Sequence, residues 1–191
     1  MRAGEGERST FGGQLATTIA SDKDTGGLLE VIILSGGKGA SFPLHRHRKA
    51  HESFFVLDGQ LELSIDGKKS LLSRGDYANI PPGLPHGYWM RGHRTQILSW
   101  AVESNLARMY SLIGEPYAGR VHPSEVPSDI AAELLEKAQA GSDVEFLGAA
   151  ASFDTPRLMP VAIAPKGVEA YVIESGEGER MIAAQQLLHQ L

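Results

Sequence analysis

Four side chains with metal-binding atoms stand out in the first half of the chain. His45 and His47 are separated by one residue, and Glu52 follows after four more. His86 comes 39 residues after His47, directly behind a segment rich in proline and glycine. Three imidazoles and one carboxylate suit a mid-series divalent metal that must also hold a substrate. The spacing therefore predicts one metal site with these four ligands, for Fe, Mn, Co or Ni, with Zn also acceptable.

Strand geometry explains how the two neighbouring histidines would meet. Residues i and i+2 of a strand point to one face. His45 and His47 would therefore face the same point inside a barrel, whereas Arg46 would face away. Arg46, Arg48 and Lys49 would then form a solvated rim, although a role in attracting an anionic substrate stays open.

Glu52 is predicted to open the next strand. It would share one face with Phe54 and Val56, which places a carboxylate beside the two imidazoles. Alternation sends His51 to the other face, but His51 remains the alternative for the fourth ligand position. The rigid turn before His86 can hold a strand-opening imidazole against the same point. Glu52 is therefore predicted as a metal ligand and as the acid–base group of the site.

The elements that must position these residues are short strands joined by tight turns. Residues 61–65 alternate strictly between apolar and polar and end at Asp66 and Gly67, a strong signal for a two-residue hairpin turn. This alternation places Glu62 and Ser64 on the outer face. Many short strands without the spacing of strand–helix–strand units predict an all-β antiparallel sandwich or barrel. Further strands are expected at residues 28–34, 53–57, 77–80 and 95–102.

Beyond the last of these strands the pattern becomes helical. Apolar residues at helical spacing predict one helix over about 106–113, closed by Gly114. Ser128 is the predicted N-cap of a second helix that runs to about Ala140 and ends at Gly141. These helices are expected to cover an edge or an open end of the barrel rather than to form a separate domain.

Composition excludes several classes of function. The 191 residues carry a net charge of −5 without a basic block, which argues against nucleic acid as a partner. The absence of cysteine removes disulfides, thiolate metal sites and cysteine nucleophiles. The sequence shows neither the apolar segment of a signal peptide nor a run that could span a bilayer. A cytoplasmic protein without membrane partners is therefore expected.

A short internal repeat links the two ends of the chain. Residues 4–8 recur as residues 176–180, and the same offset of 172 residues pairs 14–15 with 186–187. A repeat of this kind indicates a duplicated structural unit. The predicted organisation is a barrel at residues 1–120, a helical and loop extension that packs on it at 121–164, and a partial repeat of the barrel opening at 165–191.

The residues around the first two histidines match a known motif. Gly39, His45, His47, Glu52 and Gly59 stand at the positions of the first signature motif of the cupin superfamily. The chain therefore resembles the cupins. In that family a metal is bound by the histidines and the glutamate of this motif and by one further histidine.

The second cupin motif fits with one departure. Gly75, Pro81, Gly83 and His86 stand at the expected positions, but Met90 replaces the usual asparagine. That asparagine is not a metal ligand, so the departure concerns the lining of the pocket. The resemblance implies a cupin jelly-roll β-barrel with a few peripheral α-helices in the C-terminal part, in agreement with the strand pattern.

Within the superfamily the chain is most similar to the bacterial quercetin 2,3-dioxygenases, which contain two cupin barrels. The similarity covers residues 3–120 and, as a second barrel opening, 165–187. It implies a metal-dependent non-haem dioxygenase in which the glutamate takes the proton of a flavonol 3-hydroxyl, O2 adds, and the heterocycle opens with loss of carbon monoxide. The alternatives are another metal-dependent cupin enzyme, such as an isomerase or decarboxylase, and a non-catalytic cupin that binds a metal or ligand.

Apolar residues near the motifs are candidates for the pocket of a small, flat aromatic substrate. Apolar residues on both faces of the strand that carries Glu52 also imply that its outer face is covered. On that outer face, Phe55 and Leu57 predict a homodimer, with residues 169–180 added as an edge strand to the partner's barrel. The candidate pocket residues are Phe42, Phe54, Tyr88, Trp89 and Met90.

Overall fold

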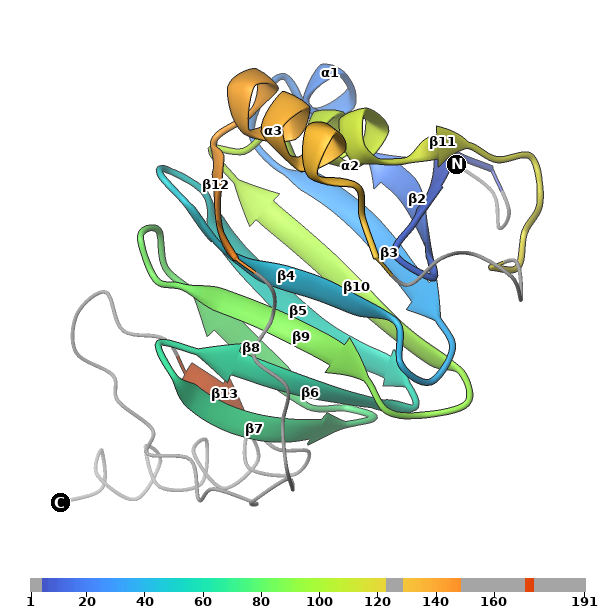
Figure 1. Ribbon diagram of the computed structural model, residues 1–191, viewed down its shortest axis with the longest axis vertical. Helices are drawn as coiled ribbons and strands as arrows, with labels where there is room; N and C mark the ends of the chain where they lie inside the picture. Colours follow the sequence, from blue (N-terminus) through green and yellow to red (C-terminus); the bar gives the residue numbers. More distant parts are fainter. Residues whose placement is uncertain (1–4, 123–128, 149–170, 174–191) are drawn as a thin grey trace, which may run out of the picture.

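Two antiparallel sheets carry the strands of the predicted site, and they pack face to face (Figure 1). The computed structural model describes residues 5–122, 129–148 and 171–173. The larger sheet has the strand order β11-β1-β2-β3-β10-β5-β8-β13, and the smaller sheet has the order β12-β4-β9-β6-β7. This all-β jelly-roll barrel with few helices confirms the predicted fold class.

The predicted strands correspond to β3, β5, β6, β8 and β10, with ends displaced by at most two residues. The larger sheet consists of β1 (Arg8–Phe11), β2 (Gln14–Ala20), β3 (Glu30–Gly36), β5 (His51–Asp58), β8 (Tyr77–Ile80), β10 (Thr95–Val102), β11 (Glu115–Pro116) and β13 (Tyr171–Ile173). The smaller sheet consists of β4 (Ser41–His47), β6 (Gln60–Ile65), β7 (Lys68–Ser73), β9 (His86–Met90) and β12 (Val144–Gly148).

The hydrophobic core lies between the two sheets. Alternate residues of each strand point inward, as the period of two requires. Each large apolar side chain buried in this way contributes roughly 1.5–3 kcal/mol to stability. This free energy can offset the cost of the polar groups that are buried among the apolar side chains. Fully buried core residues include Ile32, Leu34, Phe54, Val56 and Ile97 of the larger sheet and Phe42, Leu61, Leu63, Leu72 and Tyr88 of the smaller.

The hairpin between β6 and β7 has the predicted two-residue turn. Asp66 and Gly67 have φ angles of 49° and 74°, the left-handed conformation that this turn requires at both positions. Glu62 belongs to the outward-facing set of β6, but it is buried, contrary to the expectation for an outer polar residue. Arg91 donates a hydrogen bond to Oε2 of its carboxylate and so compensates for part of the lost hydration, whereas Oε1 is buried without a hydrogen-bond partner.

The helices lie together at one end of the barrel (Figure 1). They are α1 (Asp22–Thr25), α2 (Leu106–Ile113) and α3 (Ala132–Gly141). The bounds of α2 are those predicted, and its inner face is buried. The second predicted helix begins later than expected, at Ala132, and Ser128 lies outside the described residues. Both α2 and α3 cover the barrel end, which confirms their peripheral role.

The short strand β13 adds to the free edge of β8 within the same chain. The prediction that residues 169–180 extend a partner's barrel is therefore wrong for this part of the segment, because the edge it pairs with is the chain's own. The repeat at 176–180 and the rest of the C-terminal part lie outside the described residues. Among the described residues, no helix has both the length and the apolar character needed to cross a membrane.

Candidate metal centre

Three strands bring the predicted ligands together. His45 and His47 are buried on one face of β4, with Arg46 between them on the other face. His86 opens β9 directly opposite His45 in the register of the smaller sheet. Glu52 reaches the same point from β5 of the larger sheet. The cluster therefore joins the two sheets of the barrel.

The four side chains form one compact, buried cluster. Each offers one ligand atom, and these atoms all lie within 4.8 Å of one another. Nε2 of His86 and Nε2 of His47 lie 3.1 and 3.3 Å from Oε2 of Glu52. The four residues are at most 2% exposed. Burying several polar groups together costs free energy unless they pair with one another or bind a common ion. The arrangement is therefore characteristic of an ion site.

Hydrogen bonds set the orientation of two of the imidazoles. Nδ1 of His45 donates to the carbonyl oxygen of Pro43 at 2.8 Å, and Nδ1 of His86 donates to that of Leu84 at 3.0 Å. A carbonyl only accepts, so Nδ1 carries the proton in both rings. Nε2 of a neutral ring then keeps its lone pair, which is the form that binds a metal ion.

His47 provides the most direct test of whether these residues fit a metal ion. Its Nε2 is buried and lacks a hydrogen-bond partner, although it lies within the cluster. A cation bound by three imidazoles and one carboxylate would satisfy this atom and neutralise the charge of Glu52. The donor set fits a divalent ion of the Fe, Mn, Co, Ni or Zn type.

The charges within the cluster favour a bound cation. Burial by itself lowers the pKa of His47, but the carboxylates of Asp143 and Glu52 on either side of the ring raise it to about 9. Burial raises the pKa of Glu52, yet hydrogen bonds and charges of His47 and His86 bring it well below its ordinary value. Burial is the main reason why the pKa of His45 falls well below its usual range. Glu52 is therefore ionised, and its negative charge favours a cation beside it.

A family comparison agrees with the fold and the cluster. Residues 34–101, which contain all four clustered side chains, match the model of the Cupin domain family. The barrel is therefore similar to the domains of this family. Over 187 residues, 98% of this chain, the sequence is 46% identical to quercetin 2,3-dioxygenase of Bacillus subtilis, of which it covers 56%. An uncharacterized protein of Methanocaldococcus jannaschii is 34% identical over 59 residues, which are 31% of this chain and 45% of that protein. The chain thus spans about half the length of the curated relatives it matches.

Two of the matching solved structures show lower sequence identity. KdgF from Halomonas sp. matches with a TM-score of 0.48 and 19% identity over 53% of this chain and 88% of that chain. An RmlC-like cupin from Shewanella frigidimarina matches with a TM-score of 0.47 and 20% identity over 53% of this chain and 86% of that chain.

Two polar residues at the candidate metal centre were not predicted from the sequence. Ser99 of β10 donates a hydrogen bond of 2.9 Å to Oε1 of Glu52. Asp143, in the loop between α3 and β12, accepts a hydrogen bond of 3.1 Å from Nδ1 of His47. Ser99 could have been found as one of the two polar members, with Thr95, of the inward series of the predicted strand 95–102. Asp143 has no such signal, since it lies 96 residues from its partner.

The predicted pocket residues divide into two groups. Trp89 lies on the face of β9 opposite Tyr88 and Met90 and is only partly buried, so it faces away from the cluster. This position follows from strand alternation, which places neighbouring residues on opposite faces. The other four lie buried inside the barrel: Phe42, Phe54, Tyr88 and Met90.

An aromatic residue of β12 adds to the surroundings of the cluster. The ring centroid of Phe42 lies 4.9 Å from that of His45. Phe146 lies 6.1 Å from both of these rings and is only partly buried. It was missed because it belongs to the segment predicted as a helical and loop extension. Its partly buried ring therefore lies beside His45 and Phe42.

The cationic residues near the cluster contact the protein itself. The guanidinium of Arg46 donates to the carboxylate of Glu145 at 2.9 Å. The guanidinium of Arg48 donates to the carbonyl oxygen of Ser142 at 2.6 Å. These contacts favour the rim interpretation over the capture of an anionic substrate. His51 is exposed on the face of β5 opposite Glu52, so it lies away from the cluster.

Proposed function

We propose that this cupin is a metal-dependent dioxygenase of the quercetin 2,3-dioxygenase type, which opens the heterocycle of a flavonol with O2. The observation that carries the proposal is the buried cluster of three imidazoles around one ionised carboxylate. The 46% identity to quercetin 2,3-dioxygenase of Bacillus subtilis over 98% of the chain supports the choice of substrate class.

One divalent ion would be held by His45, His47, Glu52 and His86. We propose Fe, Mn, Co or Ni, with Zn as an acceptable replacement, because imidazole and carboxylate ligands suit all of them. When bound, the ion supplies a Lewis acid for an enolic oxygen and a centre for the reaction with O2. The three histidines contribute neutral nitrogens, so the ion keeps enough positive charge for this role.

Glu52 is the proposed base of the reaction. Its carboxylate is ionised, and Ser99 holds Oε1 by a hydrogen bond, which leaves Oε2 directed at the imidazoles. A flavonol bound at the cluster would give the proton of its 3-hydroxyl group to Oε2. The resulting enolate is the electron-rich form of the substrate, and Glu52 keeps the proton within the closed site.

Apolar side chains around the cluster would bind the flat rings of the substrate. The ring centroids of Phe42 and Phe146 lie 4.9 and 6.1 Å from that of His45. Phe54, Tyr88 and Met90 line the barrel interior. Such a lining excludes water and strengthens the electrostatic interactions within the site.

The proposal includes the predicted organisation and assembly. In this proposal the barrel occupies residues 1–120, the extension 121–164 packs on it, and 165–191 is a partial repeat of the barrel opening, although β13 within it pairs with β8 of the first barrel. The outer face of the larger sheet supports a homodimer, because Phe55, Leu57, Leu98 and Trp100 are only partly buried there. A cytoplasmic location stays a prediction from the sequence.

Measurement of gas exchange tests the activity. The chain is loaded separately with Fe, Mn, Co or Ni and mixed with quercetin, and O2 uptake and CO release are followed together. Equal amounts of both gases are expected with at least one metal. Glu52→Gln should retain bound metal but lose turnover by about 10²-fold or more.

Glu145→Gln is the matched control, because it removes a carboxylate that pairs with Arg46 outside the cluster. Its turnover should equal that of the unmodified chain. Bound metal without O2 uptake or CO release, for every metal, would contradict the dioxygenase. That result would favour another metal-dependent cupin enzyme or a non-catalytic metal-binding cupin.

A further inference from the structure

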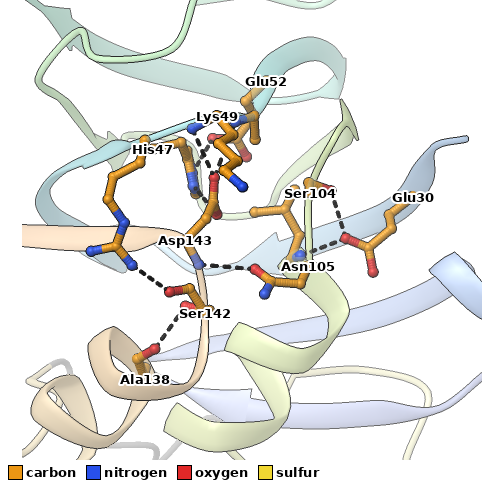
Figure 2. A network of polar contacts seen from close by, with 12 residues as sticks. Glu30, His47, Lys49, Glu52, Ser104, Asn105, Ala138, Ser142 and Asp143 are labelled. Carbon is orange, nitrogen blue, oxygen red and sulfur yellow. Dashed lines mark hydrogen bonds and ion pairs between the residues drawn. The ribbon is translucent and has the colours of Figure 1, made fainter. Parts of the chain in front are cut away.

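Asp143 reaches the candidate metal centre from outside the strands that carry its ligands. It follows Ser142, the C-terminal cap of α3, and precedes β12. Its Oδ1 accepts a hydrogen bond of 3.1 Å from Nδ1 of His47. Figure 2 shows the Asp143 carboxylate directed at the His47 ring, with Glu52 on the other side of that ring. The imidazole is therefore held between two carboxylates.

This contact makes His47 different from the other two histidines. Nδ1 of His45 and Nδ1 of His86 each donate to the carbonyl oxygen of the residue two positions earlier. Those acceptors belong to the same strand or turn as the histidine, so the local backbone conformation alone positions them. The acceptor for His47 is a charged side chain from a segment 96 residues away. A carboxylate bonded to the far nitrogen of a ligating imidazole fixes its tautomer and makes it a stronger ligand.

The second oxygen of Asp143 fastens the turn that separates the ligands on β4 from Glu52 on β5. Oδ2 accepts hydrogen bonds from the backbone N–H groups of Lys49 and Ala50 at 3.3 and 3.0 Å. The backbone N–H of Arg48 donates to the carbonyl oxygen of Asp143 at 3.1 Å. One residue therefore holds both a candidate ligand and the connection between two ligand-bearing strands.

Asp143 is itself held by the helical end of the barrel. Its backbone N–H donates to Oδ1 of Asn105, the N-cap residue of α2, at 3.1 Å. Buried Glu30 accepts hydrogen bonds from Ser104 and from the backbone N–H groups at the start of α2. The hydroxyl of Ser142 donates to the carbonyl oxygen of Ala138 in α3 (Figure 2). The network thus runs from both helices to His47.

We infer that Asp143 is a positioning residue for the metal centre: it keeps the proton of His47 on Nδ1, directs Nε2 at the ion, and makes α3 and its following loop part of the functional unit. This inference rests on the proposed function in one respect, namely that the cluster binds a divalent ion. It assigns no contact between Asp143 and the substrate.

Asp143→Asn separates positioning from folding. The amide has nearly the same shape, but its single oxygen cannot accept from the backbone N–H groups and from His47 at once. If its NH2 group faces Nδ1, that nitrogen must accept, the proton moves to Nε2, and the ring can no longer bind the ion. The expected result is Co²⁺ binding about 10- to 100-fold weaker, measured by competition with a chelator and by the visible spectrum of the bound ion.

Glu145→Gln is again the matched control, because it changes a carboxylate two residues away that points outward to Arg46. Its Co²⁺ affinity should stay within twofold of the unmodified chain. Equal affinities of Asp143→Asn and the unmodified chain would overturn the inference while leaving the proposed function intact. Absence of Co²⁺ binding by the unmodified chain would overturn both. Normal Co²⁺ binding without quercetin turnover would overturn only the dioxygenase.

A second measurement covers the case in which Asp143→Asn fails to fold. The ring nitrogens of the unmodified, Zn²⁺-loaded chain are observed by NMR, and the His47 signals are assigned by their loss in His47→Gln. The inference requires a proton on Nδ1 of His47 that is shifted downfield by a charged acceptor, compared with the Nδ1 protons of His45 and His86. A proton on Nε2, or an Nδ1 proton like those of the other two rings, would overturn it.

Discussion

The hydroxyl of Ser99 on β10 donates a hydrogen bond of 2.9 Å to Oε1 of Glu52 on the adjacent strand β5. Both residues are buried inside the barrel. The bond occupies one carboxylate oxygen and leaves the other, Oε2, 3.1 Å from Nε2 of His86. The register between two strands of the larger sheet therefore determines which oxygen of the carboxylate faces the histidines of the smaller sheet.

Ser99→Ala should lower turnover more than metal binding. Loss of the hydroxyl leaves Oε1 without a donor in a buried site and lets the carboxylate rotate, a change worth about 1–2 kcal/mol. Turnover of quercetin should fall by about tenfold, with metal content unchanged. Ser53→Ala is the control, because that hydroxyl contacts Tyr77 and Asn79 instead of Glu52. A larger effect of Ser53→Ala than of Ser99→Ala on turnover would contradict this role.

His86→Ala should remove the metal, whereas His51→Ala should not. His86 is buried in the cluster, and its loss leaves three of the four ligands. His51 precedes Glu52 directly in β5, but strand alternation places it on the opposite, exposed face. Metal content after dialysis, measured by elemental analysis, should drop to near zero for His86→Ala and stay at one ion per chain for His51→Ala. Metal loss in His51→Ala would reinstate His51 as the fourth ligand.

The metal-free protein should lose stability as the pH rises from about 6.5 to 9. The pKa of His47 is about 9 in the fold, against an ordinary value of 6.5. A group whose pKa is raised on folding stabilises the fold fully below the ordinary value, and this stabilisation is lost as the pH rises through the folded value.

The free energy of unfolding should fall over this interval by about 1–3 kcal/mol, measured by urea unfolding in the presence of a chelator. His47→Gln should remove most of the decline. A stability curve of the unmodified chain that rises between these pH values would show that His47 is neutral in the metal-free fold.

Gly59→Ala should destabilise the barrel far more than Gly67→Ala. Both glycines have left-handed φ angles, of 75° and 74°, so both substitutions carry a similar conformational cost. A Cβ atom at Gly59 would collide with the carbonyl oxygen of Arg94, whereas a Cβ atom at Gly67 would meet nothing within 4 Å. Urea unfolding should show a loss of more than about 3 kcal/mol for Gly59→Ala and about 1–2 kcal/mol for Gly67→Ala. Equal losses would mean that the turn at Gly59 can move.

Phe55→Glu should dissociate the proposed homodimer. Phe55 is partly buried on the outer face of β5, beside Leu98 of β10, and a charge there would oppose burial against a second copy. Light scattering at micromolar concentration should give a dimer for the unmodified chain and a monomer for the variant. Leu28→Glu is the control, because Leu28 is 74% exposed and lies before β3 instead of on β5 or β10. A monomeric unmodified chain would refute the dimer.

Local sequence was enough to predict the parts of the site that depend on strand period and turn type. His45 and His47 share a face because two residues complete one period of a strand. The hairpin at Asp66 and Gly67 follows from the left-handed conformation that few residue types adopt. The separation of Glu52 from His51 needed only the same alternation, and the structure places both as predicted.

Contacts across the barrel were decided only by the tertiary structure. Ser99 meets Glu52 because β10 pairs with β5 in a particular register, and Asp143 meets His47 because α3 folds back over the end of the barrel. Glu62 is buried although it belongs to the outer face of β6. Alternation determines the face on which a side chain lies, but the elements that cover that face come from segments tens of residues away. The sequence therefore determined the candidate ligands, and only the packing of distant segments determined the groups that hold them in place.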